Sequence, residues 1–133
     1  MSAWKPEGYP SLSSYVLVED AERAIRFIEQ VFDALRLRMI PADQAGKWRH
    51  AELRIDDSVL MIADALPGYS ARPADLHLYV RDVDAVHARA VSLGATSVQD
   101  PQRKDDEDKR GGFKGPGDIT WWVATRGSTA GSP

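Results

Sequence analysis

Residues 75–96 read DLHLYVRDVDAVHARAVSLGAT, and they predict a strand, a helix and the start of a second strand. The first strand is indicated by strict alternation of apolar with polar or aromatic residues up to Val80. Asp82 or Asp84 can cap the helix, and Gly94 can end it. The apolar positions of this helix recur at helical spacing and are Val83, Val86, Ala90 and Leu93.

The same pattern occurs a second time, 62 residues earlier in the chain. Residues 13–18 alternate in the same way, and Asp20 stands where Asp82 stands. The apolar positions of the helix are here Ala24, Ile25, Ile28, Val31 and Phe32. The offset persists downstream, where residues 58–60 correspond to residues 120–122. The chain therefore contains an internal duplication, although two copies are too few for a repeat array.

Each half continues with three further strand patterns. They cover residues 35–40, 48–55 and 58–63 in the first half and residues 96–98, 111–114 and 119–125 in the second. Residues 66–74 contain two prolines and a glycine and predict the linker between the halves. We therefore expect one α+β domain over residues 13–125, made of two βαβββ modules at residues 13–65 and 75–125.

The two ends and one internal run carry weaker structural signals. Residues 1–12 are expected to form an N-terminal arm, in which Trp4 and Tyr9 could pack on the domain or on a partner subunit. Residues 126–133 are small and polar and predict a disordered tail. The mixed-charge run at residues 102–109 is typical of a solvated loop, although a loop there could also cover the mouth of a site.

Composition narrows the functional class. The chain has 133 residues, which suits one domain, and 43% of them are hydrophobic and 28% charged. The formal net charge is −3 with no basic stripe, which argues against a nucleic-acid partner. There are no cysteines, so disulfides, thiolate metal sites and a cysteine nucleophile are excluded. No apolar run approaches a membrane span and no signal-peptide pattern is present, which predicts a cytoplasmic protein with no membrane partner.

A resemblance to a known family is carried by four segments, in this order: VLVEDAERAIRF (16–27), HAELRIDDSVLMIAD (50–64), LYVRDVDAVHARAVSLGAT (78–96) and GGFKGPGDITWWVAT (111–125). They resemble the glyoxalase/bleomycin-resistance/dioxygenase (vicinal oxygen chelate) superfamily, above all its compact members with a closing motif of about GGxxDPFGNTWWxAT. The resemblance implies paired βαβββ modules whose curved mixed sheets surround a pocket. It also implies helices on the outer face and, usually, a homodimer.

The metal chemistry of this family is where the sequence departs from it. The resemblance implies a divalent metal held by one residue from each of four strands, typically His, Glu, His and Glu. The corresponding positions here are Ser13, Asp75, Trp122 and either Leu60 or Met61. A hard cation needs oxygen or imidazole ligands, and only Asp75 is a good one. We therefore expect no bound metal and no cofactor, with Asp75 and the nearby His77 as weak metal candidates.

Alternation also predicts which side chains line the pocket. The residues expected under the helices are Val16, Val18, Leu76, Leu78 and Val80. The opposite face then carries Tyr15, Leu17, Asp75, His77 and Tyr79, with Trp48, His50, Glu52 and Arg54 from the third strand and Thr120 and Trp122 from the last. Aromatic surfaces with a few charges are common in small-molecule sites. The ligand-binding candidates are Tyr15, Trp48, His77, Tyr79 and Trp122, with Trp122 at the centre.

Several of these residues also have a purely structural interpretation. His77 could be a core histidine bonded to a hydroxyl, and Trp122 could lie in a subunit interface. Its neighbour Trp121 is expected in the core, packed under the helices. His87 lies among polar positions of the second helix and is expected at the surface.

His50 and Glu52 are open to two interpretations. They could lie on a solvated or dimer face, with Glu52 paired to Arg54 or Lys114. Alternatively, His50, Glu52 and His77 are the candidates for catalysis, since imidazole and carboxylate groups serve as general bases.

Two function classes remain open. The first is a binding module, a homodimer that sequesters a planar or aromatic small molecule by stacking and without a metal. The second is an enzyme, a glyoxalase-like lyase or isomerase or a dioxygenase. It would use a non-standard metal set formed by His50, Glu52, His77 and Asp75, or no metal and His77 or Glu52 as general base. The missing ligands and the aromatic face favour binding, and the sequence does not identify the ligand.

Overall fold

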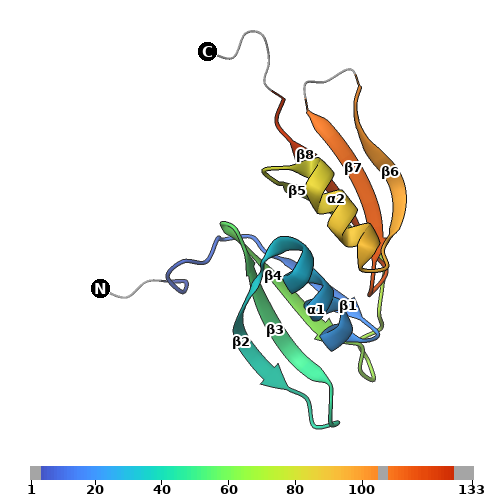
Figure 1. The fold of residues 1–133 in the computed structure, drawn as a ribbon. Coiled ribbons are helices and arrows are strands. Elements are labelled where there is room, and N and C mark those ends of the chain that lie inside the picture. Colours follow the sequence, from blue (N-terminus) through green and yellow to red (C-terminus); the bar gives the residue numbers. More distant parts are fainter. Residues whose placement is uncertain (1–3, 105–107, 128–133) are drawn as a thin grey trace. The chain divides into compact units, whose positions relative to one another are not determined.

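The computed structural model describes residues 4–104 and 108–127 and divides into two compact units. The boundary between the units falls after Arg72, inside the predicted linker. Each unit contains one helix and a four-stranded sheet (Figure 1), and we call them the first and second modules. Parts of the predicted arm, charged loop and tail, at residues 1–3, 105–107 and 128–133, lie outside the described residues. No helix among the described residues is long and apolar enough to cross a membrane.

The first module follows the order strand, helix, three strands. Its elements are β1 (Ser14–Val18), α1 (Ala21–Phe32), β2 (Leu35–Pro41), β3 (Trp48–Ile55) and β4 (Ser58–Asp64). The strands lie in the order β1-β4-β3-β2, with β1 parallel to β4 and the other pairs antiparallel. A parallel pair needs a long crossover, and the segment from α1 to β3 supplies it.

The second module repeats this plan. Its elements are β5 (Ala74–Tyr79), α2 (Val83–Ser92), β6 (Thr96–Arg103), β7 (Lys109–Gly115) and β8 (Ile119–Thr125). The strand order is β5-β8-β7-β6, and again only the first pair is parallel. The prediction of two βαβββ modules with mixed sheets is confirmed. Strand β6 is longer than predicted, and β7 begins at Lys109, so both ends of the run predicted as a loop belong to strands.

The register of the parallel strands settles which residue corresponds to Trp122. Tyr15 of β1 pairs with Met61 of β4, and His77 of β5 pairs with Trp122 of β8. Met61 rather than Leu60 is therefore the counterpart of Trp122. The offset of 62 that relates β1 to β5 becomes 61 at the last strand of each module.

Each helix covers one face of its own sheet. The buried residues of α1 are Ala21, Ala24, Ile25, Phe27, Ile28 and Val31, and the buried residues of α2 are Val83, His87 and Ala90. Trp121 of β8 is 2% exposed, which confirms its expected place in the core. The surface position expected for His87 is wrong. This side chain is buried because Ser97 Oγ, 2.9 Å from its Nε2, satisfies the imidazole.

Both helices begin in the same way. Asp20 and Asp82 cap α1 and α2 by accepting from the backbone N–H groups three residues later, at 3.2 and 3.1 Å. The first N–H of each helix is bound by the last residue of the adjacent parallel strand. In the first module the Asp64 carboxylate accepts from Ala21 N at 2.9 Å. In the second module the Thr125 hydroxyl oxygen accepts from Val83 N, also at 2.9 Å. The end of the fourth strand therefore fixes the start of the helix in both modules.

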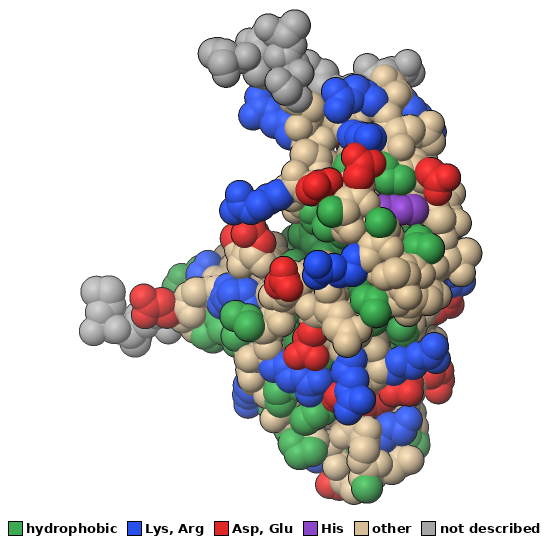
Figure 2. Space-filling view, viewed as in Figure 1, with side chains coloured by type: hydrophobic (Ala, Val, Ile, Leu, Met, Phe, Trp, Pro, Cys, Tyr) green, Lys and Arg blue, Asp and Glu red, His purple; other side chains and the backbone are tan. Residues whose placement is uncertain are grey.

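Acidic and basic side chains are mixed on the face of the molecule that Figure 2 shows. Hydrophobic side chains lie between them. Exposed apolar residues include Leu12, Leu35, Tyr69 and Tyr79, each more than half exposed.

Candidate functional site

Strand β7 shows which face of the second sheet is free of the helix. The Phe113 ring lies 6.0 Å from the ring of His87 on α2, so Phe113 points toward the helix. Gly111 shares that face, since a Cβ there would lie 3.3 Å from His87 Cδ2. Gly112 points the opposite way, and a Cβ there would meet Trp122. Trp122 therefore lies on the face away from α2.

Three of the predicted ligand-binding residues share this helix-free face of the second module. His77 is the strand partner of Trp122, and Tyr79 follows two residues later on the same side of β5. The rings of His77 and Tyr79 meet edge to face, with their centroids 5.0 Å apart. Tyr79 is 59% exposed and Trp122 is half-buried. The structure therefore brings His77, Tyr79 and Trp122 together.

The indole of Trp122 is held at two points. A Cβ on Gly112 would lie 2.7 Å from both Cε3 and Cζ3 of the indole and 2.9 Å from Val98 Cγ2. The six-membered ring therefore lies against the backbone of β7, in space that only glycine leaves open. At the other end, Trp122 Nε1 donates to Asp75 Oδ2 at 2.9 Å. Asp75, a weak metal candidate in the sequence, thus accepts a hydrogen bond from the indole.

His77 is oriented by an arginine that sequence reasoning did not select. Arg110 Nε donates to His77 Nε2 at 3.2 Å. Burial and the Arg110 charge lower the pKa of His77, and they outweigh the opposing effect of Asp108. A neutral imidazole that accepts at Nε2 carries its hydrogen on Nδ1. His77 is therefore a neutral acceptor in this arrangement.

Asp108 joins Tyr79 to the same arginine. Tyr79 Oη donates to Asp108 Oδ2 at 2.7 Å, and Arg110 Nη2 lies 3.4 Å from that oxygen. The hydrogen bond to Asp108, and then its negative charge, raise the pKa of Tyr79. Asp108 lies within the charged run at residues 102–109 and Arg110 directly follows that run, so the run was the sequence signal that charged residues could reach the site.

A second group of candidates lies in the first module. Tyr15 of β1 and His50 of β3 lie on either side of β4, with ring centroids 5.7 Å apart and ring planes tilted by 44°. His50 Nε2 is 2.7 Å from Glu52 Oε2. Glu52 alternates with Ala51 and Leu53, which are buried in the core, so it points away from α1. It is nevertheless only 4% exposed, which is unusual for a carboxylate.

Tyr9 explains the burial of Glu52. Tyr9 Oη donates to Glu52 Oε1 at 2.5 Å, and Arg54 Nη2 donates to the carbonyl oxygen of Gly8 at 3.0 Å. Gly8 and Tyr9 of the N-terminal arm therefore pack on the first module, whereas Trp4 is 81% exposed. Within the first module, Glu52 accepts from Tyr9 and contacts His50, whereas the guanidinium of Arg54 donates to Gly8 rather than to Glu52.

These contacts set the protonation states of the cluster. Burial alone would raise the pKa of Glu52, but the hydrogen bonds from Tyr9 and His50, aided by the positive charge of Arg38, leave it below its ordinary value. The hydrogen bond to Glu52 raises the pKa of Tyr9. Glu52 is therefore an anion at neutral pH, and Tyr9 retains its proton.

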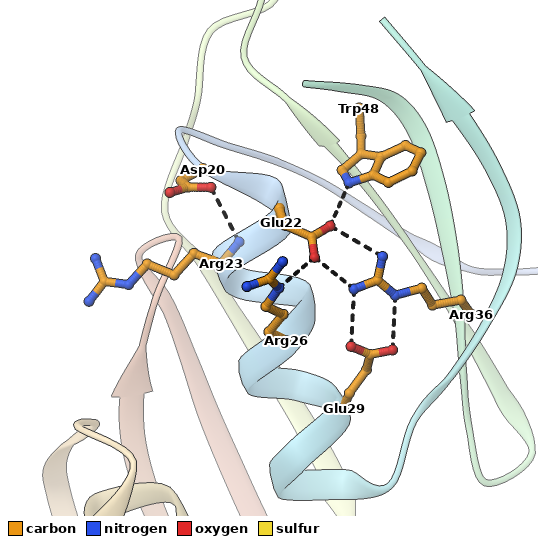
Figure 3. Close-up of polar contacts among 7 residues, drawn as sticks. All are labelled: Asp20, Glu22, Arg23, Arg26, Glu29, Arg36 and Trp48. Carbon is orange, nitrogen blue, oxygen red and sulfur yellow. Dashed lines mark hydrogen bonds and ion pairs between the residues drawn. The ribbon is translucent and has the colours of Figure 1, made fainter. Parts of the chain in front are cut away.

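Trp48 does not share a face with His50, and that expectation is wrong. Its indole Nε1 donates to Glu22 on α1 at 2.9 Å (Figure 3). Its backbone N–H donates to Asp64. The cause is a register irregularity where the end of β2 pairs with the start of β3. Ile40 pairs with His50 but Pro41 pairs with Trp48, so one extra residue reverses the alternation.

Trp48 belongs instead to a network of charges on the helix side. Arg36 of β2 makes paired hydrogen bonds to Glu29 and to Glu22, at distances from 2.9 to 3.2 Å, and Arg26 also binds Glu22 (Figure 3). Together these contacts tie α1 to β2 and β3. These contacts hold α1 against the sheet, and they explain the position of the Trp48 side chain without a bound ligand.

The positions that the resemblance implies for metal ligands do not fit a divalent cation here. With Met61 identified, the set is Ser13, Met61, Asp75 and Trp122, and it offers one carboxylate, one hydroxyl, one thioether and an indole. Asp75 is moreover engaged by Trp122. Over residues 4–104 and 108–127, no three His, Asp or Glu side chains are grouped so that they could hold a metal ion. Hard cations require more oxygen or nitrogen ligands than this.

Comparison with known proteins identifies the family. The model of the Glyoxalase/Bleomycin resistance protein/Dioxygenase superfamily matches residues 12–123. The chain belongs to this superfamily. It is 41% identical over 100 residues to an uncharacterized protein of Mycobacterium bovis, a match covering 67% of this chain and 65% of the relative. The matched segment thus spans about two-thirds of each protein.

Solved structures of this superfamily share the fold. TioX from Micromonospora sp. ML1 superposes with a TM-score of 0.75 at 21% identity, covering 88% of this chain and 98% of TioX. A glyoxalase/bleomycin resistance protein from Streptomyces sp. CB03234 gives a TM-score of 0.65 at 22% identity, covering 84% and 96%. At these identities the likeness establishes the fold alone.

Proposed function

We propose that this member of the glyoxalase/bleomycin resistance superfamily binds a planar, aromatic small molecule by stacking on Trp122, without a divalent metal. The observation that carries the proposal is the fixed orientation of the indole. Gly112 lets the ring lie against the sheet and Asp75 binds its N–H group. A preoriented aromatic ring loses little conformational entropy on binding, so it can anchor a flat ligand.

His77 and Tyr79 would flank the stacked ligand. Both lie beside Trp122 on the helix-free face, and their rings already contact each other. His77 has a hydrogen on Nδ1 that can be donated, because its Nε2 accepts from Arg110. These groups would set the orientation of the ligand while the indole supplies most of the binding free energy.

The charges around Trp122 favour an uncharged or cationic ligand. The carboxylate of Asp75 lies at the edge of the indole, while the positive charge of Arg110 is directed to His77 and Asp108. An indole face also attracts cations by its quadrupole. An anionic ligand stacked on the indole would be repelled by the charge of Asp75 at its edge.

Calorimetric titration with three matched probes tests this proposal: an N-methylquinolinium cation, 1-methylnaphthalene and 1-naphthoate. We expect saturable binding of the cation and the neutral probe, and weaker binding of the anion. Trp122→Ala should weaken binding at least tenfold, which is about 1.4 kcal/mol. Trp4→Ala is the control, because Trp4 is 81% exposed and Lys5 lies over its ring. Unchanged binding in Trp122→Ala, or no binding of any probe, would overturn the proposal.

We propose in addition that the chain forms a homodimer. Each sheet ends in strands with an unpaired edge, β1 and β2 in one and β5 and β6 in the other. Such edges promote association unless they are covered. Leu35 at the start of β2 is 64% exposed and Leu12 before β1 is 87% exposed. Light scattering should give twice the chain mass of 14.7 kDa, and a mass of one chain at high micromolar concentration would contradict the dimer.

A further inference from the structure

A cluster in the first module is not used by the Trp122 site. It consists of Tyr9, His50 and Glu52, with Tyr15 beside it. We propose that His50 accepts a proton from a weakly acidic small molecule, such as a phenol, bound at this cluster, and that Glu52 and Tyr9 position the imidazole. The inference does not depend on stacking at Trp122.

The hydrogen bonds fix the tautomer of His50. An ionised carboxylate only accepts hydrogen bonds, and Glu52 already accepts from Tyr9 through Oε1. The contact of 2.7 Å between His50 Nε2 and Glu52 Oε2 therefore places a hydrogen on Nε2. In the neutral imidazole the free lone pair is then on Nδ1. Nδ1 is the atom of this cluster that can take up a proton.

Glu52 stabilises the product of that proton transfer. When Nδ1 gains a proton the imidazole becomes a cation, and the buried carboxylate 2.7 Å from Nε2 offsets its charge. Burial strengthens this effect because the local dielectric constant is lower than in water. Tyr9 occupies the other carboxylate oxygen, so Glu52 cannot rotate to bind the ligand itself.

The surroundings of the cluster indicate the class of ligand. Tyr15 is 53% exposed and its ring lies 5.7 Å from that of His50, so it offers an aromatic wall to a ring-bearing molecule. Arg38 and Arg54 act on Tyr9 with their positive charges. After proton transfer, the positive charges of the two arginines and of His50 outnumber the single negative charge of the carboxylate. This excess of positive charge favours a ligand that becomes an anion. A phenol meets both conditions.

The proposed step is a balanced proton transfer. The O–H bond of the ligand breaks, an N–H bond forms at His50 Nδ1, and the electron pair of the broken bond stays on the ligand oxygen. The products are the bound ligand anion and the imidazolium of His50. The proton returns or passes to water when the ligand leaves, so no further reactant is needed.

The test uses para-nitrophenol, whose ionised form absorbs visible light and whose neutral form does not. The probe is titrated with protein at a pH below its pKa in solution. We expect a saturable rise in phenolate absorbance with the parent protein and at least a tenfold smaller rise with His50→Gln. Glu52→Gln should reduce the rise several-fold. Tyr69→Phe is the control, because Tyr69 lies in the linker and is 65% exposed.

The tautomer of His50 is a second measurement, and a purely structural role of Glu52 would not change it. With nitrogen-labelled histidine, long-range proton–nitrogen spectra should place the hydrogen of His50 on Nε2 and that of His77 on Nδ1. Tyr9→Phe keeps the aromatic ring but removes the hydroxyl that donates to Glu52. Glu52→Gln should give a mixture of the two His50 tautomers and leave the tautomer of His77 unchanged. A phenolate signal that persists in His50→Gln, its absence with the parent protein, or a hydrogen on His50 Nδ1 would each overturn the proposal.

Discussion

The indole of Trp122 occupies the space that a side chain at position 112 would fill. A Cβ on Gly112 would lie 2.7 Å from two carbons of the ring, closer than such atoms approach. The preceding Gly111 leaves similar space on the other face of β7, where His87 of α2 packs against the strand. Two consecutive glycines therefore open both faces of one strand, one to the helix and one to the proposed ligand site.

Gly112→Ala should disturb the proposed site without touching its aromatic residues. The added methyl group must displace the indole or the strand, and overpacking of this kind destabilises by about 1–3 kcal/mol. We expect a lower midpoint of unfolding in urea and weaker binding of the quinolinium probe. Lys114→Ala on the same strand is the control, because Lys114 is half-exposed and forms an ion pair with Asp118. Probe affinity equal to that of the parent protein would show that the position of the indole does not matter.

The elements of the fold were predictable because their signals are local. Alternation and helical spacing lie within each element, and the duplication reinforced them. His87 was missed because its polarity suggested a surface position, whereas Ser97, ten residues away, satisfies the imidazole in the core. The glycine pair was recognised as part of a strand, but its purpose depends on residues from α2 and β8.

Glu22 should contribute stability that depends on pH. Hydrogen bonds from Arg36, then Trp48 and Arg26, hold its pKa at about 2 against the ordinary 4.5, although burial opposes them. Because the folded-state pKa is the lower one, this stability is present above about pH 4.5 and is lost as the pH falls toward 2.

The matched variant for this prediction is Glu22→Gln. At pH 7 it should lower the free energy of unfolding by about 1–2 kcal/mol, a modest value because the network is partly exposed. The difference from the parent protein should shrink between pH 4.5 and 2 in urea titrations. Glu19→Gln, at an exposed position just before α1, should leave both quantities unchanged. A difference independent of pH would contradict the assignment to charge.

Asp64 should be a stability determinant of the first module. It is 2% exposed and accepts from Ala21 N at 2.9 Å and from Trp48 N at 2.6 Å. Asp64→Ala leaves two backbone donors without an acceptor, which should cost about 2–4 kcal/mol in urea unfolding. Asp64→Asn keeps an accepting oxygen and should recover part of the loss. Equal destabilisation by both variants would show that the charge, not the hydrogen bonds, is what matters.

The candidate site was predictable only where the strands are regular. His77, Tyr79 and Trp122 share a face because β5 and β8 pair without interruption. Trp48 was misplaced because the irregularity between β2 and β3 reverses the alternation. Tyr9 could not be assigned to Glu52, since 43 residues separate them and the arm has no periodic pattern.

Metal content follows from the ligand set. Ser13, Met61, Asp75 and Trp122 supply one good ligand for a hard cation, so we expect far less than one zinc, iron, manganese or nickel ion per chain. Elemental analysis of protein purified without chelator measures this. A chelator should also leave the affinity for the quinolinium probe unchanged. A stoichiometric metal would show that other residues bind it and would favour an enzyme.

The most direct measurement of the central claim follows the indole N–H resonances of the four tryptophans, assigned by single Trp→Phe variants, while the quinolinium probe is added. Stacking changes the magnetic environment of the ring that it covers. We predict a saturable shift of the Trp122 resonance and little change for Trp48, which is bound to Glu22. A Trp122 resonance that stays fixed while the probe binds would contradict the claim that this residue is the platform of the site.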